Sequence, residues 1–107
     1  MSKRILVYCG SSKGHNPIYE QEAKKLVHAL KRYDCELIFG AGSVGIMGVL
    51  ADEYLKIGGH CVGVIPSFME PWEVKHTGIQ ECFVTESMHA RKQFMANRAD
   101  GVIALPG

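Results

Sequence analysis

The feature that most constrains the fold is a series of five short apolar runs that alternate with stretches of helical periodicity. The runs lack regular polar alternation, which is typical of strands covered on both faces. They lie at residues 5–9, 36–39, 61–65, 82–84 and 101–105. Alternation of strands and helices predicts an α/β fold, with helices on both faces of a doubly wound parallel sheet.

Three helices are expected between these strands. Asn16 and Pro17 are typical of a helix N-cap and a first helical position, and helical spacing continues to Leu30. A second helix is expected over residues 45–57, followed by the C-terminal glycine pair at 58–59. Ser87 can cap a third helix. We expect residues 1–107 to form a single Rossmann-like domain with five strands.

Composition and charge exclude several function classes. Lys and Arg total 12 against 11 Asp and Glu, so the chain offers no basic field for nucleic acid. No apolar run approaches a membrane span, and no signal peptide is recognisable. The cysteines are far apart and form no C-x-x-C pair, which predicts buried, reduced thiols in a cytoplasmic protein. They are Cys9, Cys35, Cys61 and Cys82.

Ligands of open α/β sheets bind at the carboxyl ends of the strands, and three of these ends are rich in glycine or serine. They lie at residues 10–12, 40–48 and 106–107. Gly40, Gly42 and Gly45 match G-x-G-x-x-G, but they follow the second strand. No acidic residue stands about 20 positions later to hold an NAD ribose, which argues against a dehydrogenase. A phosphate-binding loop and simple close packing explain these glycines equally well.

The expected third helix carries two arginines, Arg91 and Arg98, on one face. If Met88 and Met95 are buried, Arg91 lies close to the buried edge, where arginines usually pair with a carboxylate or a phosphate. Periodicity alone favours a solvated basic face. The five histidines show no ligand spacing, which favours surface or packing roles over metal binding.

Several motifs, in order and at the expected separations, resemble the Lonely Guy (LOG) family of cytokinin riboside 5′-monophosphate phosphoribohydrolases, once taken for lysine decarboxylases. They are V-Y-C-G-S-S (7–12), G-S-V-G-I-M-G (42–48), G-G-H (58–60), G-V-I-P (63–66), M-H-x-R-K (88–92) and A-D-G (99–101), leading to L-P-G (105–107). Together they span essentially the whole chain. Ala41 replaces a glycine of the common G-G-G-S form, and Ala90 replaces the glutamate of M-H-E-R-K.

The resemblance implies hydrolysis of the N-glycosidic bond of a purine nucleoside 5′-monophosphate, of cytokinin or adenosine type, to the free base and ribose 5-phosphate. It implies no metal and no organic cofactor, and it implies a homodimer. Arg91 is the implied catalytic residue. The implied substrate-binding residues are Gly10, Ser11, Ser12, Gly42, Ser43, Gly45, Met88, Lys92, Pro106 and Gly107.

The family's motif continues from Pro106 and Gly107 as P-G-G-x-G-T-x-x-E. In the family, its glycines and threonine bind the 5′-phosphate, and its glutamate is the catalytic carboxylate. Because only the first two residues are present, the resemblance implies a nucleotide-binding domain truncated after the fifth strand. We therefore expect the activity of this chain to be impaired. The alternative is a protein that binds a nucleotide without cleaving it, similar to the related molybdenum-cofactor carriers.

Overall fold

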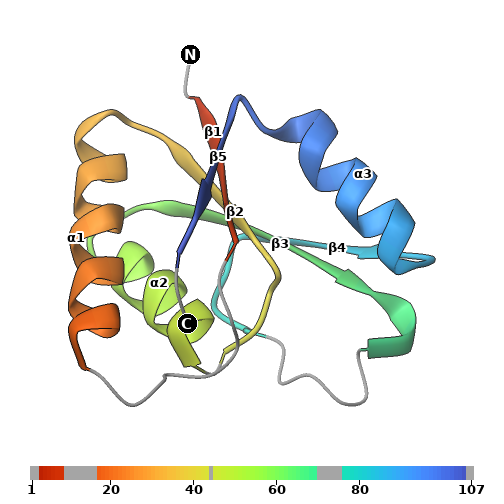
Figure 1. Ribbon diagram of the computed structural model, residues 1–107, viewed down its shortest axis with the longest axis horizontal. Helices are drawn as coiled ribbons and strands as arrows, with labels where there is room; N and C mark the ends of the chain where they lie inside the picture. Colours follow the sequence, from red (N-terminus) through yellow and green to blue (C-terminus); the bar gives the residue numbers. More distant parts are fainter. Residues whose placement is uncertain (1–2, 9–16, 44, 70–75, 106–107) are drawn as a thin grey trace.

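The computed structural model describes residues 3–8, 17–43, 45–69 and 76–105, and these form a parallel five-stranded sheet with helices on both faces (Figure 1). The prediction of an α/β fold with a parallel sheet is therefore confirmed. Each expected strand is present, with ends shifted by one residue or less where both ends are described. The strands are β1 (Arg4–Tyr8), β2 (Glu36–Phe39), β3 (His60–Pro66), β4 (Glu81–Thr85) and β5 (Gly101–Ala104).

The strand order is β4-β3-β2-β1-β5, so the direction of winding reverses at β1. The chain moves outward from β1 to β4, and then crosses back to place β5 on the other side of β1. Such a reversal leaves a crevice at the carboxyl ends of the two strands that flank it, where ligands of open α/β sheets bind. The topology therefore predicts a ligand-binding site at the carboxyl end of β1.

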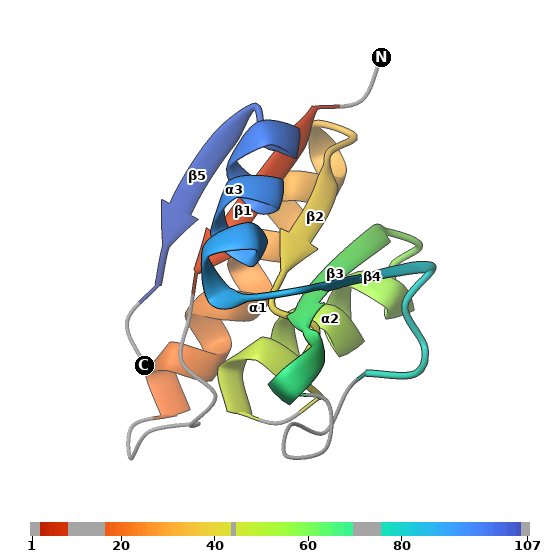
Figure 2. The ribbon, with the colours of Figure 1, turned by 90° about the vertical axis from the view of Figure 1, so that its right-hand side faces the viewer.

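Helices α1 (Pro17–Arg32) and α2 (Gly45–Lys56) cover one face of the sheet, and α3 (Met88–Arg98) covers the other (Figure 2). A short 3-10 helix, η1 (Ser67–Met69), follows β3. Alternate residues of each strand point to opposite faces. Thus Leu37 packs in the cluster beneath α1 and α2, whereas its neighbour Ile38 packs in the cluster beneath α3 with Met95. Burial on both faces explains why the strands are continuously apolar.

The predicted helix ends are confirmed where they are described. The Ser87 hydroxyl accepts a hydrogen bond from the Ala90 amide at 3.0 Å and caps α3. Gly58 follows α2 with φ of +85°, a backbone conformation that suits glycine. Two other residues hold a left-handed conformation without being glycine, namely Asp34 (φ 54°) and Ala41 (φ 69°).

The cysteine prediction holds for two of the described thiols. Cys35 and Cys61 are buried, and burial raises the pKa of Cys61 to about 12. Cys82 is only half-buried because it lies on the edge strand β4, so the prediction that it is fully packed was wrong. Cys9 lies outside the described residues. None of the described helices is long and apolar enough to cross a membrane.

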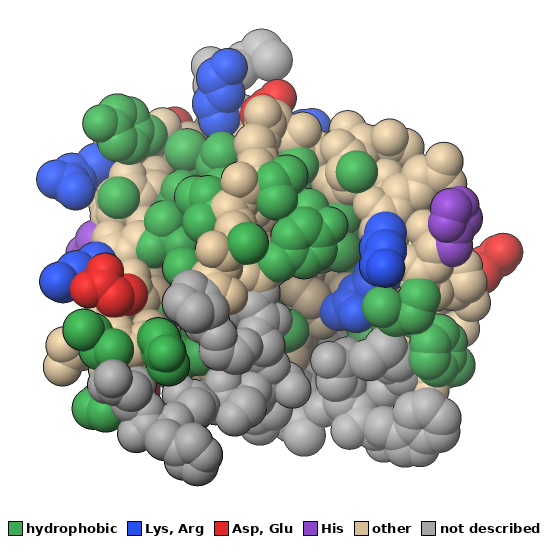
Figure 3. Space-filling model, viewed as in Figure 1, with side chains coloured by type: hydrophobic (Ala, Val, Ile, Leu, Met, Phe, Trp, Pro, Cys, Tyr) green, Lys and Arg blue, Asp and Glu red, His purple; other side chains and the backbone are tan. Residues whose placement is uncertain are grey.

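Strand β5 forms the other edge of the sheet and remains open to solvent. Its residue Val102 is 59% exposed, and hydrophobic side chains gather along both sides of the strand (Figure 3). The edge strand of an open sheet has a neighbouring strand on one side only, which explains this exposure.

Candidate functional site

A cavity of about 210 Å³ lies at the carboxyl ends of β1 and β2, beside the first two turns of α3. Methionine and other apolar side chains form much of its wall, and two of the lining side chains are positively charged. It is lined by Val7, Tyr8, Gly40, Met47, Met88, Arg91, Lys92 and Met95. The cavity therefore occupies the crevice that the reversal of winding at β1 predicts.

Arg91 is the most firmly held polar side chain of this cavity. Its Nε donates to the Val64 carbonyl at 2.9 Å, and its Nη2 donates to the Gly40 carbonyl at 2.8 Å. Its Nη1 lies 3.9 Å from the sulfur of Met88. The guanidinium thus bridges the carboxyl-terminal region of β3 and the residue that follows β2, so its position is fixed from two directions.

The orientation of α3 explains this placement. Met95 is 3% exposed and packs against the sheet, and Arg91 lies one turn earlier on the same face. The interpretation of the two arginines as a solvated basic face, which periodicity favoured, is therefore wrong. Arg98 also packs inward, with its guanidinium carbon 4.7 Å from the centre of the Phe83 ring. Lys92 remains exposed.

Close packing accounts for several glycines of the 40–48 segment. A Cβ at Gly40 would collide with the Arg91 guanidinium, and one at Gly48 would collide with the main chain of Ser43. The Gly42 amide donates a hydrogen bond to the sulfur of Met47 at 3.0 Å. A Cβ at Gly42 would lie 2.8 Å from that sulfur. Of the two explanations that the sequence left open, packing therefore applies to Gly40 and Gly42.

A second cavity, of about 400 Å³, lies between α1 and α2. It is lined by Glu20, Lys24, Ser43, Gly45, Gly48, Val49, Asp52, Glu53 and Lys56. Its carboxylates outnumber its lysines, and the hydrogen bond with His28 lowers the pKa of Glu53, which keeps that carboxylate ionised. The described lining of the Arg91 cavity includes two cations, Arg91 and Lys92, which suit an anion.

The structure divides the predicted site residues between these places. Met88, Arg91 and Lys92 share the first cavity, whereas Ser43 and Gly45 line the second. Gly42 is buried against Met47. The remaining predicted residues lie outside the described part of the chain, namely Gly10, Ser11, Ser12, Pro106 and Gly107.

Sequence reasoning missed three residues that shape this region. Tyr8 and Met47 line the Arg91 cavity. His76 holds the turn beside it, because its amide donates to the Ala41 carbonyl at 2.7 Å and its Nε2 lies 2.6 Å from Asp52 Oδ1. The position of Tyr8 at the end of a strand was the available signal for that residue. His76 is too far from its partners in the sequence for spacing to reveal its role.

Among the described residues, one group of side chains lies close enough together to hold a metal ion. It consists of Glu36, His60 and Glu81, which begin β2, β3 and β4 at the amino edge of the sheet. The Arg91 cavity is at the carboxyl edge, so these three residues form a separate feature.

Curated relatives match this chain over almost its whole length. It is 40% identical over 105 residues to cytokinin riboside 5′-monophosphate phosphoribohydrolase LOG2 of Arabidopsis thaliana, covering 98% of this chain and 49% of that one. It is 42% identical over 106 residues to the cytokinin riboside 5′-monophosphate phosphoribohydrolase of Rhodococcoides fascians, covering 98% and 54%. The chain spans about half the length of these relatives.

Solved structures share the fold at low sequence identity. The Moco carrier protein of Chlamydomonas reinhardtii superimposes with a TM-score of 0.80 at 19% identity, covering 100% of this chain and 64% of that one. The molybdenum cofactor binding protein of Rippkaea orientalis gives 0.80 at 22% identity, with the same coverage. At such identities the likeness establishes the fold alone.

The family model described as "Possible lysine decarboxylase" matches residues 47–107, more than half of the chain. This segment includes Met88, Arg91 and Lys92, which the structure brings together in one cavity. The chain therefore belongs to the possible lysine decarboxylase family, which is the LOG family.

Proposed function

We propose that this chain binds a purine nucleoside 5′-monophosphate in the Arg91 cavity, as part of a phosphoribohydrolase that cleaves the N-glycosidic bond. Relatives about 40% identical carry the name cytokinin riboside 5′-monophosphate phosphoribohydrolase, which supports this substrate class. The chain spans about half of their length. That these 107 residues cleave the nucleotide is therefore proposed along with the binding.

The observation that carries the proposal is the guanidinium of Arg91, which is fixed by two main-chain carbonyls at the rim of a largely apolar cavity. A guanidinium held in place orients an anion without losing much side-chain entropy on binding. The neighbouring cation Lys92 adds to the positive potential. The thioethers of Met47, Met88 and Met95 offer a polarisable surface for a flat base.

In the proposed reaction, the oxygen of a water molecule bonds to C1′ of the ribose as the bond from C1′ to the base nitrogen breaks. The water loses a proton, the base leaves with the bonding electron pair and takes up a proton in turn, and the sugar leaves as ribose 5-phosphate. Positive charge develops at the sugar ring, which a carboxylate can stabilise. The family resemblance assigns that carboxylate to the motif that begins at Pro106. The role proposed for Arg91 is to orient the nucleotide at the ribose.

The test is release of free adenine from adenosine 5′-monophosphate, followed by chromatography, together with calorimetric measurement of nucleotide binding. We expect Arg91→Ala to weaken binding by roughly 10- to 100-fold, the worth of a charge-assisted contact. Arg32→Ala is the matched control, because Arg32 is an exposed arginine at the end of α1. A circular dichroism spectrum for each variant verifies that it is folded.

Adenine release that disappears in Arg91→Ala would support the hydrolase function for this chain. Binding without release would support the alternative, a nucleotide-binding protein that does not cleave its ligand. Equal binding by the wild type and Arg91→Ala would contradict the proposed site.

A further inference from the structure

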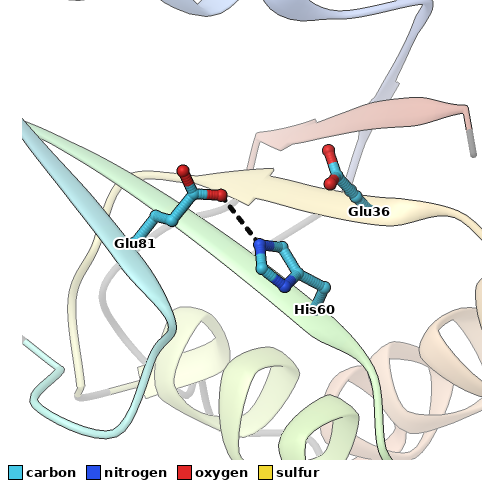
Figure 4. Close-up of side chains that lie close together, drawn as sticks. All are labelled: Glu36, His60 and Glu81. Atoms are coloured by element: carbon cyan, nitrogen blue, oxygen red, sulfur yellow. Dashed lines mark hydrogen bonds and ion pairs between the residues drawn. The ribbon is translucent and has the colours of Figure 1, made fainter.

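A second cluster of chemically capable side chains lies at the amino edge of the sheet, on the face that α3 covers (Figure 4). We propose that Glu36, His60 and Glu81 bind a divalent first-row transition-metal ion, with Zn²⁺ as the best match. One ligand atom from each of the three side chains lies within 4.8 Å of the other two. This site is independent of the proposed nucleotide site.

The main chain of three adjacent strands sets the positions of these side chains. Glu36 and His60 are the first residues of β2 and β3 and are direct partners in the parallel register. Glu81 begins β4 and pairs with Val62, two residues along from His60. Residues two apart on a strand share a face, so His60 and Val62 point the same way. Hydrogen-bonded strands hold a ligand set more firmly than loops do.

The distances suit coordination after a small adjustment. His60 Nε2 lies 2.8 Å from Glu81 Oε2 and is hydrogen-bonded to it. Zinc binds histidine nitrogen and carboxylate oxygen at about 2.0–2.2 Å, so two ligands on a tetrahedron stand roughly 3.3–3.6 Å apart. The His60–Glu81 pair would therefore open by under about 1 Å, and Glu36 would approach by at most about 1.5 Å. Rotations of the glutamate side chains can supply both movements.

The donor set also suits a dication. Two carboxylates and a neutral imidazole give a charge of −2, and nitrogen with oxygen is the ligand combination that first-row metals accept. Three protein ligands leave a coordination position for water. The three side chains are between 29% and 40% exposed, so an ion can reach them from solvent.

Arg4 is the competing cation. Its Nε lies 3.2 Å from Glu36 Oε2, and its side chain is 46% exposed. Exposed ion pairs of this kind contribute little to stability, so an incoming dication can displace the guanidinium. Two other histidines in the described part of the chain also contact a carboxylate, in the pairs His28–Glu53 and His76–Asp52. Among the described residues, neither has a second acidic side chain within reach as His60 does.

The test uses the untagged chain, freed of metal with EDTA and titrated with Zn²⁺ in a calorimeter. We expect saturable binding of one ion per chain, and at least a tenfold loss of affinity in both His60→Gln and Glu81→Gln. His28→Gln is the matched control, because it removes a histidine from a comparable histidine–glutamate pair on α1 and should bind zinc like the wild type.

No saturable binding by the wild type would overturn the proposal, and so would equal affinity in His60→Gln. If His60→Gln fails to fold, Glu36→Gln replaces it, because that change keeps the size of the side chain and removes its charge. Unchanged zinc affinity in a folded Glu36→Gln would exclude Glu36 as a ligand and overturn the three-residue site. Titration with adenosine 5′-monophosphate separates this result from the proposed function, because the nucleotide site does not include these residues.

Discussion

The Nη2 atom of Arg91 donates a hydrogen bond to the main-chain carbonyl of Gly40, at 2.8 Å. This contact joins α3 to the turn that follows β2, between residues that are 51 positions apart in the sequence. A Cβ at position 40 would occupy the space of the guanidinium, so Arg91 could keep this position only beside glycine. The glycine-rich segment and the arginine motif are therefore parts of one arrangement.

We predict that Gly40→Ala displaces Arg91 and weakens binding of adenosine 5′-monophosphate by at least about tenfold, because it breaks a contact to a charged group. Loss of this charge-assisted hydrogen bond should also lower the free energy of unfolding by about 1–3 kcal/mol. Calorimetry and urea unfolding measure the two effects. Gly101→Ala is the control, since its methyl would meet only the Ile5 side chain, at 3.2 Å, and should leave binding unchanged. Normal nucleotide affinity in a folded Gly40→Ala would contradict the role given to this contact.

Tyr8 is expected to contact the base of the nucleotide. Its side chain is 43% exposed at the end of β1 and lines the Arg91 cavity. Stacking on an aromatic ring is worth about 1–3 kcal/mol per base. We therefore predict that Tyr8→Ala weakens adenosine 5′-monophosphate binding while leaving ribose 5-phosphate binding nearly unchanged, and that Tyr8→Phe retains both. Equal losses for the two ligands in Tyr8→Ala would place the ring away from the base.

Asp34 is predicted to be a site where a substitution stabilises the protein. It has φ of +54° at the end of α1, and the Cys35 amide donates to the Leu30 carbonyl across it, as in a Schellman motif. Glycine adopts this conformation without the steric cost, and the change also removes a negative charge from a helix C-terminus. Asp34→Gly should raise the free energy of urea unfolding by about 0.5–1 kcal/mol. A lower value would show that the carboxylate contributes more than the backbone strain costs.

The buried hydroxyl of Tyr54 makes the stability of the protein depend on pH in the alkaline range. It is a fully buried residue of α2, its hydroxyl donates to the Cys35 carbonyl, and burial raises its pKa from 10.0 to about 12. The pKa of the nearby Cys61 is raised from 9.0 to about 12 by the same cause. In both cases the folded state retains a proton that the unfolded state loses. The contribution of these two groups to the free energy of unfolding is therefore fully present below about pH 9 and is lost as the pH rises toward 12.

We predict that Tyr54→Phe costs about 1–3 kcal/mol at neutral pH, because it leaves the Cys35 carbonyl without its donor. The same variant should lose less stability than the wild type between neutral pH and about pH 10.5, since one of the two titrating groups is gone. Urea unfolding at both pH values gives the comparison. An equally steep loss in the variant would contradict the assignment to Tyr54.

The sequence was sufficient to predict the elements of the fold, because local signals mark them. Continuous apolar runs identified the strands, Ser87 identified the start of α3, and Gly58 identified the end of α2. The direction in which Arg91 points depends on which face of α3 packs on the sheet, and Met95 was the residue that indicated it.

Features that depend on strand register could not be predicted in the same way. His60 and Glu81 are 21 positions apart and meet because β3 and β4 pair in parallel, a fact that linear spacing does not contain. The separation of Ser43 and Gly45 from Arg91 could not be predicted either, because the family resemblance implies that all three contact the substrate. The structure turns Ser43 and Gly45 toward α1 instead, because they lie at the start of α2 on the other face of the sheet.

The central claim is that the nucleotide binds beside Arg91 rather than between α1 and α2. The most direct test is a titration with adenosine 5′-monophosphate followed by ¹⁵N–¹H correlation spectra of the assigned, labelled protein. Our account predicts the largest, saturable shifts at the Arg91 side-chain Nε–H and at the amides of Tyr8 and Gly40. Shifts confined to Ser43, Gly48 and Asp52 would place the ligand in the second cavity and contradict the account, as would the absence of any saturable shift.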